Sequence, residues 1–281
     1  MDLVVLSGKG GTGKTTIATA LSDLYNDVIR VDCDVDASNF YMFYKGKDIE
    51  KGDFIGGKKA NIDEDICIKC MECESVCKFD AIKNFKIDPF LCEGCGACTL
   101  ICLQNAIKLE DEKTAKTFIT ELDQGLISRA EMEVGSDGSG KLVTDLRKKA
   151  KKLNKDDKLT IIDGSPGIGC SVIASITGAD AVLIVTEPTA SGLEDLKRVV
   201  DLCKHFCVFA MVCVNKYDIN KEITLDIENF INEKRIKLVG KIPYDNTVMK
   251  SINELKPITC YKESIANKAI ENMWESINKA I

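Results

Sequence analysis

Short apolar runs recur along most of the chain, and the longest of them has eight residues. A membrane-spanning helix needs about 20 consecutive apolar residues, so none of these runs is long enough to cross a bilayer. Their length is typical of strands that are buried on both faces of a sheet. They cover residues 3–6, 28–31, 159–162, 182–185, 207–214 and 238–242.

Segments with apolar positions at helical spacing lie between several of these runs, at residues 15–25, 192–205 and 221–234. Strands that alternate with helices favour parallel pairing with right-handed crossovers. The pattern therefore predicts an α/β fold with a doubly wound, mostly parallel sheet.

A glycine-rich loop directly follows the first apolar run and fits the P-loop pattern G-x4-G-K-[ST]. Glycines let backbone amides turn inward around phosphate oxygens, at the N-terminus of the helix that follows. Lys14 is expected to reach the outer phosphates, and the Thr15 hydroxyl is expected to bind Mg²⁺. The predicted nucleotide-binding residues of this loop are Gly8, Lys9, Gly10, Gly11, Thr12, Gly13, Lys14, Thr15 and Thr16.

The early lysine makes the loop more specific, because Lys9 to Thr15 resembles the deviant Walker A motif of the MinD, ParA and nitrogenase iron protein superfamily. The resemblance implies ATP hydrolysis by a homodimer that forms in the ATP state. It also implies that Lys9 reaches the nucleotide bound by the other subunit. The alternative for Lys9 is a solvated surface lysine.

Acidic residues follow two of the predicted strands, at Asp32 and Asp34 and again at Asp163. Carboxylates at the C-terminal edge of parallel strands beside a P-loop suit metal-linked phosphoryl transfer. By the resemblance, Asp34 positions the attacking water and Asn215 contacts the base. Pro243, in the loop after the last strand, is also predicted to bind the nucleotide. The predicted catalytic residues are Lys9, Lys14, Asp34 and Asp163, and the predicted Mg²⁺ ligands are Thr15, Asp32 and Asp163.

Eight cysteines form two identical runs with the spacing C-x2-C-x2-C-x3-C, which matches the thiolate ligands of bacterial two-cluster ferredoxins. Disulfides fit this compressed spacing poorly, and zinc sites normally use pairs of C-x2-C. The pattern therefore predicts two [4Fe-4S] clusters, with the fourth cysteine of each run bound to the other cluster. Cluster 1 takes Cys67, Cys70, Cys73 and Cys102, and cluster 2 takes Cys92, Cys95, Cys98 and Cys77.

The two cysteine runs belong to an internal duplication with a shift of 25 residues, which also superposes Ala81 to Lys83 on Ala106 to Lys108. Residues 59–112 resemble a bacterial-type ferredoxin, although Lys78 and Leu103 stand where that family often has proline. We expect this α+β ferredoxin-like domain to be inserted into a P-loop ATPase domain made of residues 1–58 and 113–281.

Charge and hydropathy limit the classes of molecule that the chain is expected to bind. The chain has a formal net charge of -6, and the expected insert is itself acidic, which argues against nucleic acid as a ligand. The absence of a leader or a membrane span predicts a cytoplasmic protein. The amphipathic tail at residues 261–281 carries three lysines and three glutamates. This balance favours a helix packed on the sheet over a membrane anchor.

Together these features predict a dimeric ATPase switch that carries two [4Fe-4S] clusters and couples nucleotide state to electron delivery to a partner metalloprotein. The alternative is an ATPase that carries or assembles iron-sulfur clusters or another metallocofactor. Ligand spacing determines neither the partner nor the reduction potentials. It also leaves open the question of an intersubunit cluster at Cys170.

Overall fold

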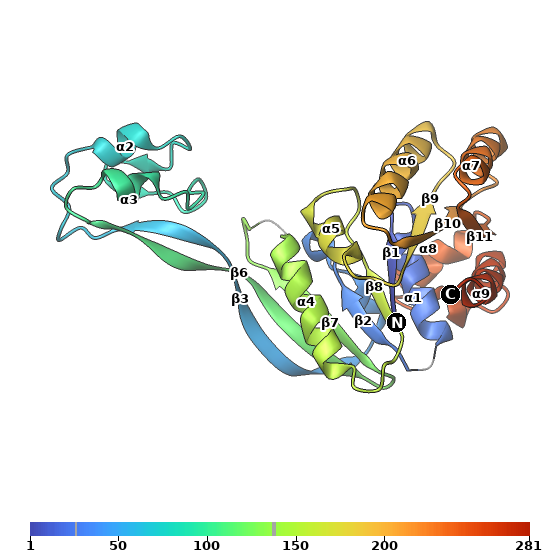
Figure 1. Ribbon diagram of the computed structural model, residues 1–281. Helices are drawn as coiled ribbons and strands as arrows, with labels where there is room; N and C mark the ends of the chain where they lie inside the picture. Colours follow the sequence, from blue (N-terminus) through green and yellow to red (C-terminus); the bar gives the residue numbers. More distant parts are fainter. Residues whose placement is uncertain (26, 137–138) are drawn as a thin grey trace. The chain divides into compact units, whose positions relative to one another are not determined.

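The computed structural model describes residues 1–25, 27–136 and 139–281, and these divide into two compact units (Figure 1). The larger unit comprises residues 1–52, 117–131 and 138–281, and the smaller comprises residues 53–116 and 132–137. The smaller unit extends beyond the expected 59–112 on both sides. The reason is that two long strands, β3 (Gly46–Ile62) and β6 (Ile107–Leu122), continue from one unit into the other.

The larger unit is built on a parallel sheet in the strand order β11-β10-β9-β1-β8-β2-β7. The pattern of apolar runs predicted six of these strands. They are β1 (Asp2–Leu6), β2 (Ile29–Asp32), β8 (Thr160–Asp163), β9 (Ala181–Thr186), β10 (Phe209–Asn215) and β11 (Lys237–Ile242). The doubly wound, mostly parallel α/β sheet is therefore confirmed.

Three strands of this sheet had not been predicted, namely β3, β6 and β7 (Leu126–Met132), which complete one edge of the sheet. Leu122 N–H donates to Gly125 O in the turn between β6 and β7, and so short a turn makes that pair antiparallel. The sequence of β3 is rich in lysine and glycine and alternates only weakly, so pairing with β6 and not apolar periodicity makes it a strand.

Helices cover both faces of this sheet (Figure 1). Side chains alternate between the two faces along each strand, so Leu3, Leu183 and Met211 share one core cluster with Ile17 and Trp274. These last two belong to α1 (Lys14–Leu24) and α9 (Ile265–Asn278). The other face packs against α4 (Gly140–Leu153), α5 (Cys170–Ile176), α6 (Ala190–His205) and α7 (Lys221–Glu233), and the short α8 (Asn246–Asn253) precedes α9.

The smaller unit repeats one backbone twice. Its helices α2 (Glu72–Val76) and α3 (Ala97–Ile101) are related by the 25-residue shift seen in the sequence. So are residues with positive φ, among them Lys69 (57°) and Gly94 (61°). The remaining elements are the paired strands β4 (Ile82–Lys83) and β5 (Lys86–Ile87).

The two halves of the smaller unit interlock. Asp63 N–H donates to Ala106 O at 2.8 Å, and the equivalent Asp88 N–H donates to Ala81 O at 2.7 Å, so each half bonds the backbone of the other. The enclosed core is small and consists of Ala60, Cys73, Ile82, Cys98 and Ile107.

Candidate functional site

The P-loop joins β1 to α1 and lies against the end of β10. Gly13 has φ 89° and forms the N-cap of α1, and a Cβ at this position would lie 2.4 Å from Asn215 Nδ2. Asn215 in turn donates this amide to Thr12 O at 2.8 Å. Only glycine fits here, because both the backbone angle and the close approach of Asn215 exclude a side chain.

Lys14 lies at the centre of a buried group of charges. Its Nζ is 2.7 Å from Asp163 Oδ1 and 3.2 Å from Asp34 Oδ2. The Thr15 hydroxyl donates to Asp163 Oδ2 at 2.7 Å. Burial alone would lower the pKa of Lys14, but Asp163 and Asp34 outweigh it and raise that pKa, so the ammonium stays charged. The structure thus brings together four predicted site residues, from the end of β8, the segment after β2 and the start of α1.

Asp32 is fully buried beside Asp163, because β2 and β8 pair in parallel with these two residues in register. Its carboxylate accepts hydrogen bonds from Ser38 Oγ at 2.8 Å, Phe40 N–H at 3.1 Å and Asp34 N–H at 3.2 Å. Burial, and then the charge of Asp163, raise the pKa of Asp32 to about 7. Adjacent buried carboxylates with a threonine hydroxyl at their edge form an all-oxygen donor set that suits Mg²⁺.

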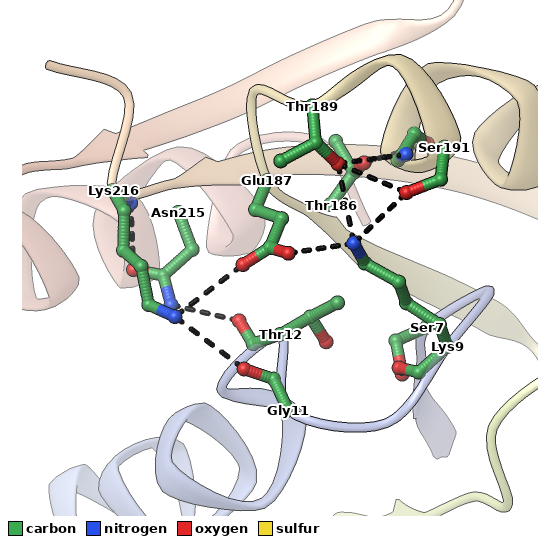
Figure 2. Close-up of polar contacts among 11 residues, drawn as sticks. Ser7, Lys9, Gly11, Thr12, Thr186, Glu187, Thr189, Ser191, Asn215 and Lys216 are labelled. Atoms are coloured by element: carbon green, nitrogen blue, oxygen red, sulfur yellow. Dashed lines mark hydrogen bonds and ion pairs between the residues drawn. The ribbon is translucent and has the colours of Figure 1, made fainter. Parts of the chain in front are cut away.

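Lys9 is bound within its own chain (Figure 2). Its Nζ is 2.7 Å from Glu187 Oε1 and hydrogen bonds to Thr189 Oγ1 at 3.2 Å and Ser191 Oγ at 3.1 Å. The other oxygen of Glu187 is 3.3 Å from Lys216 Nζ. Glu187 therefore ties the P-loop to the ends of β9 and β10.

The sequence analysis did not single out Glu187 as a site residue. Burial alone would raise its pKa, but the hydrogen bond from Lys9 and the charge of Lys216 outweigh burial and lower that pKa. A local signal for it was present, since Glu187 is the first residue after β9, at the same end of its strand as Asp32 on β2 and Asp163 on β8.

A pocket continues from the P-loop past Asn215 towards the loop after β11. Its lining is mostly apolar, as expected of a site that takes a flat ring. Asn215 and Pro243, the two residues expected at the base, both line it. The lining residues are Gly11, Gly13, Thr16, Ile17, Asn215, Lys216, Ile242, Pro243, Tyr244, Asp245, Val248, Met249, Ile252, Ala266 and Ile270.

In the smaller unit the cysteines line two separate pockets, and all eight thiols are free. Each pocket takes three cysteines from one run and the fourth from the other run. One is lined by Cys67, Cys70, Cys73 and Cys102, and the other by Cys77, Cys92, Cys95 and Cys98. These groupings are the two ligand sets expected from the spacing, but the clusters themselves stay a prediction.

The fit of these pockets to a metal centre depends on the kind of centre. Within the described part of the chain, no group of three or more His, Cys, Asp or Glu side chains is arranged to hold a metal ion. A four-iron cluster needs a wider arrangement of ligands than a single metal ion does, because each thiolate binds a different iron. Backbone amides already point at sulfur, since Ala60 N–H lies 3.5 Å from Cys92 Sγ and Ala106 N–H lies 3.3 Å from Cys102 Sγ. Four thiols, apolar walls and N–H···S contacts therefore fit such a cluster.

Cys170 begins α5 and is exposed.

Comparison with known proteins agrees with this fold and loop. Residues 3–258 match the family described as the CobQ/CobB/MinD/ParA nucleotide-binding domain. The chain belongs to this family. Its fold and its P-loop are those of the MinD/ParA-type P-loop ATPases of this family.

Several relatives from this family span nearly the whole chain. A protein of Methanocaldococcus jannaschii described as uncharacterised is 37% identical over 285 residues, which cover 100% of this chain and 98% of that protein. The septum site-determining protein MinD of Escherichia coli is 23% identical and is matched over 98% of this chain and 90% of MinD.

Among solved structures, the cell division ATPase MinD of Pyrococcus furiosus superposes with a TM-score of 0.60 at 20% identity, covering 100% of this chain and 99% of that one. The MinD of Pyrococcus horikoshii, solved with Mg-ADP, gives a TM-score of 0.59 at 19% identity, covering 100% of this chain and 97% of that one. These likenesses establish the fold. In the described residues, no helix is both long and apolar enough to cross a membrane.

Proposed function

We propose that this ATPase is a dimeric switch that carries two [4Fe-4S] clusters and couples its nucleotide state to electron delivery to a partner metalloprotein. The observation that carries the proposal is the grouping of eight cysteines around two pockets, each completed by the fourth cysteine of the other run. The same chain contains the nucleotide-binding domain of the CobQ/CobB/MinD/ParA family.

In the nucleotide site, the loop amides from Gly8 to Thr15 would hold the phosphates of ATP, with the ammonium of Lys14 against the outer ones. Thr15, Asp32 and Asp163 would hold Mg²⁺, whose charge offsets that of the phosphates and of the two adjacent carboxylates. Asp34, already 3.2 Å from Lys14 Nζ, would accept the hydrogen bond that orients the attacking water. Asn215 and Pro243 would contact the base.

Lys9 supplies the switch in this proposal. In the state described, Glu187, Thr189 and Ser191 hold its ammonium within the chain. In the ATP state Lys9 would leave Glu187 and reach the nucleotide of the second subunit, which makes the homodimer part of the active site. A charge brought in from another subunit is a known way to stabilise phosphoryl transfer.

In the smaller unit, the two cysteine sets would hold the clusters, which supply one-electron transfer when bound. Cys73 and Cys98 are buried, at 8% exposure each, which favours clusters that are retained. Cys70 and Cys95 are exposed, and this feature supports the alternative, a carrier or assembly ATPase that passes its clusters on.

The test begins with anaerobic reconstitution of the full chain, which should yield about eight Fe and eight sulfide per chain. Cluster reduction potentials should then differ between ADP and a non-hydrolysable ATP analogue. In Asp34→Ala the ATP-bound dimer should accumulate, because closure survives while the water is not positioned.

The outcomes separate the two functions. Zinc in place of iron would exclude both. Equal potentials in the two nucleotide states, together with transfer of iron and sulfide to an apo-acceptor protein, would support the carrier.

A further inference from the structure

The duplicated backbone of the smaller unit allows the surroundings of its two cysteine pockets to be compared position by position. Each residue of the first half has a counterpart 25 residues later, with the same local fold. The counterpart of a residue near the fourth cysteine of one run likewise lies near the fourth cysteine of the other. Differences at such pairs are not required by the backbone, so they point to what each pocket does.

The pocket of Cys67, Cys70, Cys73 and Cys102 has an apolar rim. Among its lining residues, Ile68 is 64% exposed, Met71 50%, Ile101 40% and Leu103 92%. Leu100, next to Ile101 on α3, is 89% exposed. We call these five side chains the apolar rim.

The corresponding positions of the second pocket are mostly polar or small. Glu93 corresponds to Ile68, Gly96 to Met71, Ser75 to Leu100 and Lys78 to Leu103, and only Val76, opposite Ile101, is apolar. The lining of the second pocket includes one large exposed apolar side chain, Phe79, among the residues described. The same fold is thus built with serine and lysine in the first half of the duplication, where the second half exposes two leucines beside the first pocket.

Exposed apolar side chains that the fold does not need indicate a contact surface. Exposed acidic residues adjoin the apolar rim: Glu72 lines the same pocket, and Glu64 and Asp65 precede Cys67 in the sequence. The ammonium of Lys69, between Ile68 and Cys70, lies over the Phe85 ring at 5.9 Å. The surface therefore combines an apolar centre with an acidic edge.

We propose that the apolar rim is the docking surface for an electron-transfer protein, and that the pocket of Cys67, Cys70, Cys73 and Cys102 is the one that exchanges electrons with it. This inference rests on the proposed function. The acidic edge calls for a partner whose redox centre opens on an apolar face ringed by lysine or arginine. Five side chains suit the small contact of a transient redox encounter and not the larger area of a stable dimer, which argues against a second copy of this chain.

The test uses full-length reconstituted protein and cytochrome c as the probe, because that protein is basic around its exposed haem edge. The variant is Leu100→Ser with Leu103→Gln, which removes apolar surface without adding charge and places a serine where the other half has Ser75. The matched control is Leu225→Ser on α7, where the leucine is 58% exposed.

In stopped-flow oxidation of the reduced protein, the double variant should be slower by about tenfold, the size expected for loss of central contacts. The control should match the unsubstituted protein. Raising the salt concentration should slow the reaction in all three, because the steering is electrostatic. Hydroxyl-radical footprinting should show Met71 and Leu103 protected when cytochrome c is added to the unsubstituted protein.

Iron content and reduction potential should be unchanged in the double variant. An unchanged rate in a variant that holds its full iron would overturn the docking surface and leave the proposed function standing, whereas absence of iron would overturn the proposed function itself. If sedimentation shows self-association of the unsubstituted protein that is lost in the double variant, the apolar rim binds a second copy of this chain. This result would overturn the proposal that it docks an electron-transfer protein.

Discussion

The two units of this protein prepare their sites in opposite ways. In the nucleotide unit, the ammonium of Lys14 is paired with Asp163 and Asp34 on a sheet whose strands are buried on both faces. In the cysteine unit, two of the five core residues are themselves proposed ligands, Cys73 and Cys98. One site rests on a packed core, and the other would form a large part of its own core.

This difference indicates which interactions stabilise each unit. A domain that cannot bury enough apolar surface needs a metal or another crosslink to remain folded. The smaller unit also exposes large apolar side chains, so little of its apolar surface contributes to folding. We therefore expect loss of metal to unfold the smaller unit and to leave the nucleotide unit unaffected.

The largest expected effect comes from Cys98→Ala. This change removes a ligand of the second set and an atom of the small core at once, so residues 53–116 should lose both clusters and their protection against hydrogen exchange. ATP binding by the larger unit should stay within about twofold of the unsubstituted protein, since the two sites belong to separate compact units and share no residue. Iron analysis, hydrogen exchange and nucleotide titration measure these outcomes.

Cys260→Ala is the matched control, because Cys260 is exposed and belongs to the larger unit. If Cys98→Ala loses its iron and the smaller unit keeps its protection against exchange, the difference drawn between the two units is wrong.

A second prediction concerns the ion pair between Lys9 and Glu187, 2.7 Å apart in this state. Lys9→Ala should bind ATP but lose turnover by about 10³-fold, the low end of what a charge supplied in trans contributes to phosphoryl transfer. Glu187→Gln should instead release Lys9 and favour the ATP dimer by about fivefold, since a partly exposed ion pair contributes about 1 kcal/mol. Sedimentation and phosphate release measure the two effects.

Glu194→Gln is the control for loss of a carboxylate, because Glu194 lies on α6, the helix that follows Glu187, and pairs with Lys197 one turn away. A Glu187→Gln protein that dimerises less readily would mean that Glu187 supports the closed state, contrary to our interpretation.

The smallest expected effect concerns Asp245, which accepts hydrogen bonds from Ser264 and from the backbone of Thr247 and Ala266. Burial alone would raise its pKa, but these bonds outweigh burial and lower that pKa to about 2. A lowered carboxyl pKa adds stability above its unfolded value of about 4, and this stability is lost as the pH falls towards 2.

Asp245→Asn should therefore lower the free energy of unfolding of the nucleotide unit by about 1 kcal/mol at pH 7, a value reduced for partial exposure. The difference in the free energy of unfolding between the variant and the unsubstituted protein should disappear as the pH falls below about 4. Urea unfolding at several pH values measures it, and Asp226→Asn, on the exposed face of α7, should show no such gap. A gap that stays constant with pH would mean that capping geometry and not charge is responsible.

Much of the nucleotide unit could be predicted because its signals are local. The apolar runs mark strands buried on both faces, and the P-loop pattern fixes where backbone amides and Lys14 must lie. Lys14, Thr15, Asp34 and Asp163 meet in space because parallel strands place their C-terminal ends at one edge of the sheet.

What could not be predicted depends on pairing across the chain. Nothing local marks residues 46–62 as a strand, since their ladder partner lies at residues 107–122. The role of Glu187 could not be predicted for the same reason, because its ion-pair partners Lys9 and Lys216 lie far from it in the sequence. The residue differences between the two cysteine pockets can be found in the duplicated sequence. Only the exposed fractions of Leu100 and Leu103 show that these side chains lie on the surface.

The exchange of fourth cysteines has a consequence for the order in which the smaller unit would be assembled. The second ligand set runs from Cys77 to Cys98 and lies inside the span of the first, from Cys67 to Cys102. Closing a shorter loop costs less chain entropy, so the inner set would form first and would then hold the ends of the outer set closer together. Maturation would thus proceed from the inside out, and a half-filled protein would carry its metal in the inner set.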